Sequence, residues 1–116
     1  MKNTKISILG TQYNILGHTE KEDEKLKELG GYCDYTTKTI VYKKITPEDL
    51  TGLEDLTFVY KRVLRHEIIH AFMYESGLWC NSFGVSCWAE NEEMTDWFAI
   101  QSPKIYKVFE ELNIQN

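Results

Sequence analysis

The chain has 116 residues, of which 42% are hydrophobic and 27% are charged. This composition is typical of one folded globular domain, which we expect to span residues 1–116, and it excludes a disordered chain. The net charge of −5 argues against a nucleic-acid partner, because phosphate binding needs clustered cations. The only basic cluster is Lys61, Arg62 and Arg65, which we expect on the exposed face of a helix.

The N-terminal segment, residues 1–17, has no continuous apolar stretch. It therefore predicts neither a signal peptide nor a membrane span, and we expect a cytoplasmic protein without membrane association. The cysteines, Cys33, Cys80 and Cys87, are odd in number and are expected to be free thiols in a reducing compartment. Cys80 and Cys87 lie too far apart in sequence for the C-x-x-C pattern of thiolate zinc sites.

The N-terminal half of the chain predicts two β-hairpins. Residues 5–18 mix apolar and polar side chains around a turn at 10–11. The charged stretch 19–29 is expected to be a short helix. Residues 31–44 are rich in Tyr, Thr, Ile and Val, and they predict a second hairpin with its turn at 36–38.

A long helix is predicted next. Thr46–Pro47 is a helix-start signal, and Thr51 with Glu54 offers a capping box. Helical periodicity runs from about residue 55 to residue 76 and stops at Gly77.

The C-terminal segment is expected to hold a loop and two helices. Residues 78–88 predict a loop rich in aromatic side chains, and helix resumes over 89–101. Ser102–Pro103 should end that helix and start a last one, which reaches about residue 112. The fold class is therefore α+β, with a small, mostly antiparallel sheet packed on the long helix plus two C-terminal helices.

The chemistry is concentrated in the sequence His66-Glu67-Ile68-Ile69-His70. Positions i and i+4 share one face of a helix, so both imidazoles can aim at one point. Neutral imidazole suits Zn²⁺, and two such ligands leave room for others. Glu67 flanks the same face and can reach a water molecule as a general base without binding the metal.

A third ligand is expected from the helix after the loop. Glu92 and Asp96 are four residues apart, so one carboxylate can bind zinc while the other orients a ligand histidine. Glu93 is the rival for the ligand position. The remaining histidine, His18, is expected to be a surface residue at a hairpin end.

H-E-x-x-H followed by N-E-x-x-x-D resembles the active-site pair of the thermolysin-like gluzincin metallopeptidases. This resemblance implies that Glu92 is the third zinc ligand and that Asp96 supports His66. The chain is also similar to small uncharacterised zincin-like proteins of phages and mobile elements of Gram-positive bacteria, through the stretches GYCDYTTKTIVY, LRHEIIHAFMYESGL and NEEMTDWFA. That similarity implies a minimal zincin-like domain and supplies no substrate.

The chain departs from the thermolysin-like pattern after His70, where it has no histidine to stabilise an oxyanion. A tyrosine is the expected substitute, and the candidates are Tyr32, Tyr35, Tyr74 and Tyr106. The large domain that completes the thermolysin cleft is also absent from this sequence.

The function expected from these features is zinc-dependent hydrolysis of a peptide bond, with a cytoplasmic protein or peptide as substrate. One strand of the second hairpin is expected to form a sheet edge beside the zinc, where an extended peptide can pair. Two alternatives stay open: a catalytically silent zinc-binding interaction module, and a hydrolase of a non-peptide amide. The sequence predicts no oligomeric state.

Overall fold

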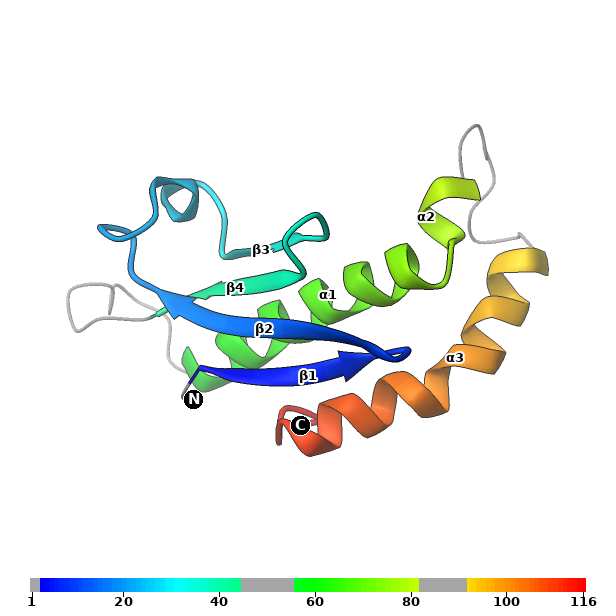
Figure 1. Ribbon diagram of the computed structural model, residues 1–116. Coiled ribbons are helices and arrows are strands. Elements are labelled where there is room, and N and C mark those ends of the chain that lie inside the picture. The colour runs from blue at the N-terminus through cyan, green and yellow to red at the C-terminus, as the bar shows by residue number, and fades with distance from the viewer. Residues whose placement is uncertain (1–2, 45–55, 82–91) are drawn as a thin grey trace.

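Four short strands form one mixed sheet in the computed structural model, which describes residues 3–44, 56–81 and 92–116 (Figure 1). The strands are β1 (Thr4–Ile8), β2 (Thr11–His18), β3 (Gly31–Asp34) and β4 (Thr39–Lys43). Their order in the sheet is β1-β2-β4-β3, with β1–β2 and β3–β4 antiparallel and β2–β4 parallel. The sheet is therefore mostly antiparallel, as predicted. The parallel pairing of β2 with β4, called the parallel seam below, was not predicted.

Both predicted hairpins are confirmed, and their turns follow from local chemistry. Leu9 and Gly10 have φ angles of 50° and 88°, the left-handed conformation that suits a two-residue hairpin turn. This turn lies one residue earlier than predicted. In the second hairpin, Asp34 Oδ1 accepts hydrogen bonds from the backbone N–H of Thr36 at 3.0 Å and of Thr37 at 3.3 Å. Such side-chain-to-backbone bonds stabilise a tight turn.

The helices are α1 (Leu56–Glu75), α2 (Leu78–Asn81) and α3 (Glu92–Glu111), together with a short 3-10 helix, η1 (Glu24–Lys27). The predicted end of the long helix at Gly77 is confirmed by its φ of 84°, and α2 replaces the start of the predicted loop. The predicted start signals at 46–47 and 51–54 lie outside the described residues. The rest of the predicted loop, 82–88, and the predicted helix start at 89–91 lie outside them as well.

The helix break predicted at Ser102–Pro103 is wrong, because α3 continues through Pro103. A proline inside a helix removes one backbone hydrogen bond, and packing on both sides can outweigh that loss. Met94 and Trp97 are buried before the proline, and Ile105 and Val108 are buried after it. One apolar face thus spans the proline and keeps the helix continuous.

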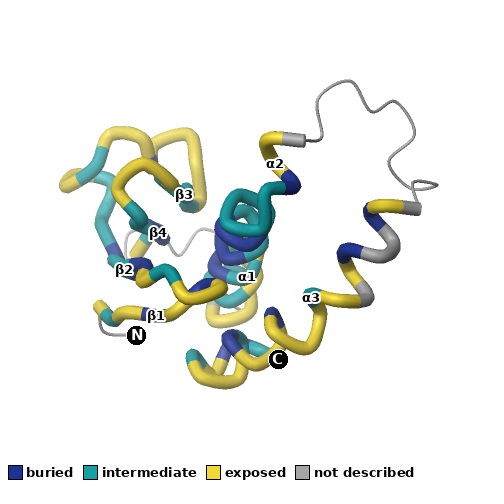
Figure 2. Tube along the Cα trace, turned by 45° about the vertical axis from the view of Figure 1, so that its right-hand side comes forward, coloured by how far each residue is buried: buried dark blue, intermediate teal, exposed yellow. Residues whose placement is uncertain are grey.

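The core lies between α1 and one face of the sheet (Figures 1 and 2). Side chains alternate along each strand, so every second residue points toward the helix. The buried side chains that meet there include Ile6, Ile8, Tyr13, Ile15, Ile40 and Tyr42 from the sheet and Leu64, Ile68, Ala71 and Phe72 from α1. The α+β fold class is confirmed.

Gly31 allows the edge strand β3 to lie close to α1. A Cβ at this position would stand 2.7 Å from the carbonyl oxygen of Val41 and 2.9 Å from Val63 Cγ1. Any larger residue would push β3 away from the helix. The glycine therefore brings the edge of the sheet beside the middle of α1, where His66 and Glu67 lie.

Candidate metal centre

Three side chains from the middle of α1 gather at one point. The Nε2 atoms of His66 and His70 are 3.0 Å apart, and one ligand atom from each of His66, Glu67 and His70 lies within 4.8 Å of the others. Two nitrogens bound to one zinc at a tetrahedral angle would lie roughly 3.3 Å apart. The group is therefore close enough to hold a metal ion.

Burial shifts the pKa values of Glu67 and His70, the two less exposed residues of this cluster. Glu67 is only 8% exposed, and this burial raises the pKa of its carboxyl, against a smaller lowering by His66. Burial also lowers the pKa of His70, with a further lowering from His66. A lowered pKa keeps the imidazole neutral at pH 7, which is the form that binds metals. A raised carboxylate pKa suits a general base.

A cavity of about 300 Å³ adjoins the cluster between β3, α1 and α2. Its wall on one side is aromatic. The ring of Tyr35 stacks on Tyr74 with centroids 4.1 Å apart and lies 6.3 Å from Trp79. The centroid of the Trp79 ring in turn lies 6.4 Å from that of the His70 ring, so the aromatic wall adjoins the candidate metal-binding group.

The strand β3 presents backbone groups to this cavity. It is the last strand of the described sheet, and Gly31, Tyr32 and Cys33 line the cavity. The Lys43 N–H donates to the Gly30 carbonyl at 2.9 Å, so hydrogen-bonded pairs fall on even-numbered residues of this strand. By the alternation of antiparallel ladders, the N–H and C=O groups of Gly31 and Cys33 point away from β4.

The two carboxylates predicted on the second helix are placed only by their backbone. Glu92 and Asp96 lie in the first two turns of α3, but their side chains lie outside the described structure. The first half of α3 is tied to the end of α1 by a 2.7 Å hydrogen bond from Trp97 Nε1 to Ser76 Oγ. Glu93 is exposed and is not part of the described group that could hold a metal ion. The third ligand therefore stays a prediction.

The four tyrosines proposed for the oxyanion fall into three environments. Tyr35 and Tyr74 line the cavity, with their rings stacked. Tyr32 also borders the cavity, but its hydroxyl donates a hydrogen bond to Asp23. Tyr106 is exposed on α3 and does not line the cavity.

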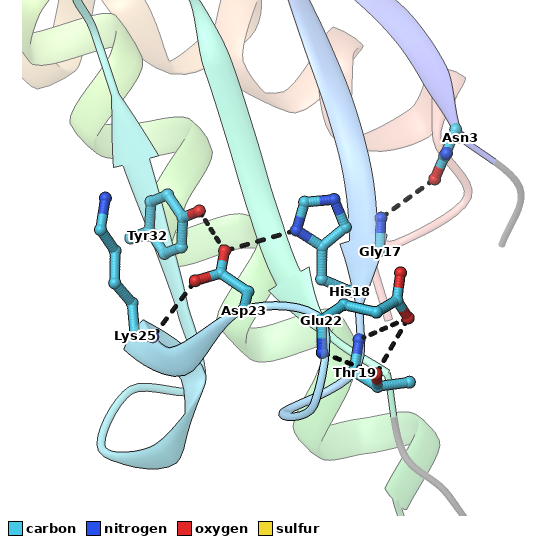
Figure 3. A network of polar contacts seen from close by, with 8 residues as sticks. All are labelled: Asn3, Gly17, His18, Thr19, Glu22, Asp23, Lys25 and Tyr32. Atoms are coloured by element: carbon cyan, nitrogen blue, oxygen red, sulfur yellow. Dashed lines mark hydrogen bonds and ion pairs between the residues drawn. The ribbon is translucent and has the colours of Figure 1, made fainter.

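His18 belongs to a different polar network, on the sheet face opposite α1 (Figure 3). Its Nδ1 lies 3.4 Å from Asp23 Oδ2, the same oxygen that accepts from the Tyr32 hydroxyl. Asp23 Oδ1 also accepts from the Lys25 backbone N–H at 3.1 Å and so caps η1. His18 is half-buried rather than a fully exposed surface residue, and its contact with Asp23 is made within the protein.

A partly buried network around Glu75 was not predicted from the sequence. Glu75 Oε2 accepts from the Tyr13 hydroxyl and from Lys38 Nζ, both at 2.7 Å. The Lys38 ammonium also lies 4.7 Å from the centroid of the Tyr74 ring. A carboxylate in the last turn of a helix opposes the helix dipole, and this placement is the signal that could have indicated a cationic partner.

Cys33 and Cys80 are free thiols, as predicted, and Cys87 lies outside the described residues. Cys33 borders the cavity, and burial, with a contribution from Glu67, raises the pKa of its thiol to about 12. The thiol is therefore protonated at neutral pH and is not a ready thiolate ligand. Across the described parts of the chain, no helix has both the length and the apolar character to cross a membrane.

No protein-family model, curated protein or solved structure matches the chain.

Proposed function

We propose that this protein is a zinc-dependent metallopeptidase that cuts a cytoplasmic protein or peptide. The observation that carries the proposal is the convergence of the His66 and His70 Nε2 atoms, 3.0 Å apart, with a buried Glu67 carboxylate beside an open cavity. We also propose that the chain is related to the small zincin-like proteins of phages and mobile elements. A regulator of the element or of its host would be a suitable substrate.

Zinc fits the donors that are present. The two imidazoles are borderline donors that suit zinc, and the lowered pKa of His70 keeps its nitrogen free to bind. His66 and His70 would hold the ion with Glu92 as third ligand, and Asp96 would orient His66. When bound, zinc supplies Lewis acidity that activates water and polarises a carbonyl group.

Residues of the chain itself would transfer the proton and position the substrate. Glu67, with its raised pKa, accepts the proton of the attacking water and later passes it to the leaving nitrogen. The outward N–H and C=O groups of Gly31 and Cys33 can pair with an extended substrate and hold it across the metal-binding group.

A catalytically silent zinc-binding interaction module is the second candidate function. One observation favours it: the Tyr32 hydroxyl, a candidate oxyanion donor, is already committed to Asp23 on the far side of β3. In such a module zinc would organise the surface around the aromatic wall. Loss of Glu67 would then leave function intact.

The test combines metal analysis with a substrate trap. Purified protein should hold about one zinc per chain, as a single three-ligand catalytic site requires. A Glu67→Gln variant should keep its zinc, lose turnover and retain its substrate in a pull-down identified by mass spectrometry. Zinc retained by both His66→Ala and His70→Ala would remove the basis of the proposal. A partner interaction that survives Glu67→Gln but not His70→Ala would favour the silent module.

A further inference from the structure

The metal-binding group has a second cavity on its other side. This cavity, of about 430 Å³, lies between α1 and the chain that leads into β3, and Arg62 and Glu28 face it. His66 and Glu67 line both this cavity and the aromatic one, as does Gly31. The two cavities therefore meet at the metal-binding group and form one groove along α1 and the edge strand.

The floor of the groove follows a simple spacing on α1. Arg62, His66, His70 and Tyr74 succeed one another at intervals of four residues, so they form a continuous row on one side of the helix. The row begins with a guanidinium, passes the two metal-binding imidazoles and ends at the aromatic wall. The two ends of the groove thus differ in chemistry on either side of the reacting centre.

The aromatic end carries no net charge. Tyr35, Tyr74 and Trp79 form its wall, and Trp79 is 51% exposed although it is a large apolar side chain. The nearby cation, Lys38, is neutralised by its 2.7 Å ion pair with Glu75. An exposed aromatic wall without charge suits an apolar or aromatic side chain.

The opposite end holds a guanidinium group. Arg62 lines this end, with the Glu28 carboxylate on the facing segment, whereas Lys61 and Arg65 do not line it. Arg65 is engaged elsewhere, since its Nη1 donates to the Ile114 carbonyl at 2.6 Å. Arg62 lies over the Phe58 ring at 5.9 Å and has no ion pair within the part of the chain that is described. Its guanidinium is therefore available to a carboxylate entering the groove.

We propose that the groove selects an extended polypeptide with an apolar or aromatic side chain at the Tyr35–Trp79 end and an acidic side chain at the Arg62 end. This inference rests on the proposed function and adds the class of substrate to it. Arg62 is the residue that determines charge preference, and Trp79 is the residue that determines apolar preference. Neither is proposed to bind metal or to take part in the chemical step.

The test measures binding apart from turnover. The probes are acetylated, amidated peptides that carry Phe and Glu separated by three Ala residues, in both chain directions, with matched peptides carrying Lys for Glu or Ala for Phe. Binding to Glu67→Gln protein as purified is followed by isothermal titration calorimetry. We expect the better direction of the Phe/Glu peptide to bind about fivefold more tightly than its Lys counterpart, the scale of an exposed charge pair.

Matched variants locate the preference. Arg62→Glu should reverse the charge preference. Lys61→Glu makes the same change in charge one residue away, off the groove, and should leave the preference unchanged. Trp79→Ala should remove the preference for Phe, whereas Phe98→Ala on α3 should not. Equal binding of the Glu and Lys peptides, or no binding of any peptide, would overturn the inference.

Turnover by the unaltered protein separates this inference from the proposed function. If the Phe/Glu peptide binds with the expected preference and is never cut, the groove assignment stands and the peptidase proposal fails. If the peptides are cut without any dependence on Arg62, the peptidase proposal stands and the groove assignment fails.

Discussion

The chain has two histidine clusters on opposite sides of its sheet, and they differ in how their polar atoms are satisfied. His18, on the far face, meets an aspartate that is already bonded to Tyr32 and to a helix end (Figure 3). His66 and His70, on the α1 side, point their Nε2 atoms at each other beside a cavity. Within the described structure, neither of these two has a hydrogen-bonded carboxylate.

This difference separates a histidine used for structure from histidines that remain available to a ligand. A histidine whose partner is a neighbouring aspartate stabilises a loop, and its bonds are made within the protein. Two imidazoles whose nitrogens converge can satisfy their bonding capacity fully only with an added ligand. The contrast is visible in the geometry of these clusters and cannot be read from residue type alone.

The largest effect is expected when one histidine is removed from each cluster. His66→Ala or His70→Ala should weaken zinc binding by more than about 100-fold, beyond the usual effect of losing an outer-shell partner. His18→Ala should leave zinc binding unchanged, because its ring lies on the other face of the sheet. Competition with a chromophoric chelator measures all three affinities. A comparable loss of zinc in His18→Ala would mean that the two clusters are not independent.

The second effect concerns Glu67 and distinguishes chemistry from metal binding. Glu67→Gln should lower turnover by a factor on the order of 10² or more, the scale of losing a general base. The melting temperature should not fall, because a buried carboxylate with a raised pKa is replaced by a neutral side chain of equal size. Calorimetry and a cleavage assay on the same preparation give both results. A large drop in melting temperature would instead assign Glu67 a structural role.

The third effect concerns the hydrogen bond between Tyr13 and Glu75. Tyr13→Phe removes the buried hydroxyl that donates to Glu75. We expect a loss of about 1.5–3 kcal/mol in the free energy of unfolding, as for other hydrogen bonds to charged groups. Urea titration measures it, and Lys27→Ala, which breaks the exposed Lys27–Glu24 pair, is the control with little expected effect. Equal free energies of unfolding for the two variants would mean that the Glu75 network does not stabilise the fold.

The smallest effect appears on acidification. Hydrogen bonds from Tyr32 and His18 outweigh burial and lower the pKa of Asp23 in the folded protein. A lowered folded-state pKa stabilises the fold above the unfolded pKa of about 4, and that contribution is lost as the pH falls through the folded value. Asp23→Asn should therefore be less stable than the parent protein at pH 7 and should approach it at pH 3. A difference independent of pH would assign the effect to capping of η1 alone.

Local features of the sequence were predicted well. Both hairpins, the long helix ending at Gly77 and the alignment of His66 with His70 depend on neighbours a few residues apart. The parallel seam between β2 and β4 depends on pairing across the whole segment 19–38, which no local pattern records. The charged stretch 19–29 holds only the short η1, because Leu26 is the single buried apolar residue it contributes.

The candidate site was predictable as far as it lies on one helix. His66, Glu67 and His70 follow from helical spacing, whereas the aromatic wall combines Tyr35 from a turn with Tyr74 and Trp79 from α1 and α2. The continuous α3 was missed because a proline is a strong local signal for a break, and packing of buried residues on both sides outweighed it.

The parallel seam also sets the order in which the sheet can assemble. Each hairpin closes a short loop, a process that takes microseconds in isolated peptides. The seam, held at its ends by hydrogen bonds such as that from the Asn14 N–H to the Lys38 carbonyl at 2.9 Å, joins segments far apart along the chain. Its closure costs more chain entropy than either hairpin does. We therefore expect the two hairpins to form first and the parallel pairing of β2 with β4 to follow more slowly.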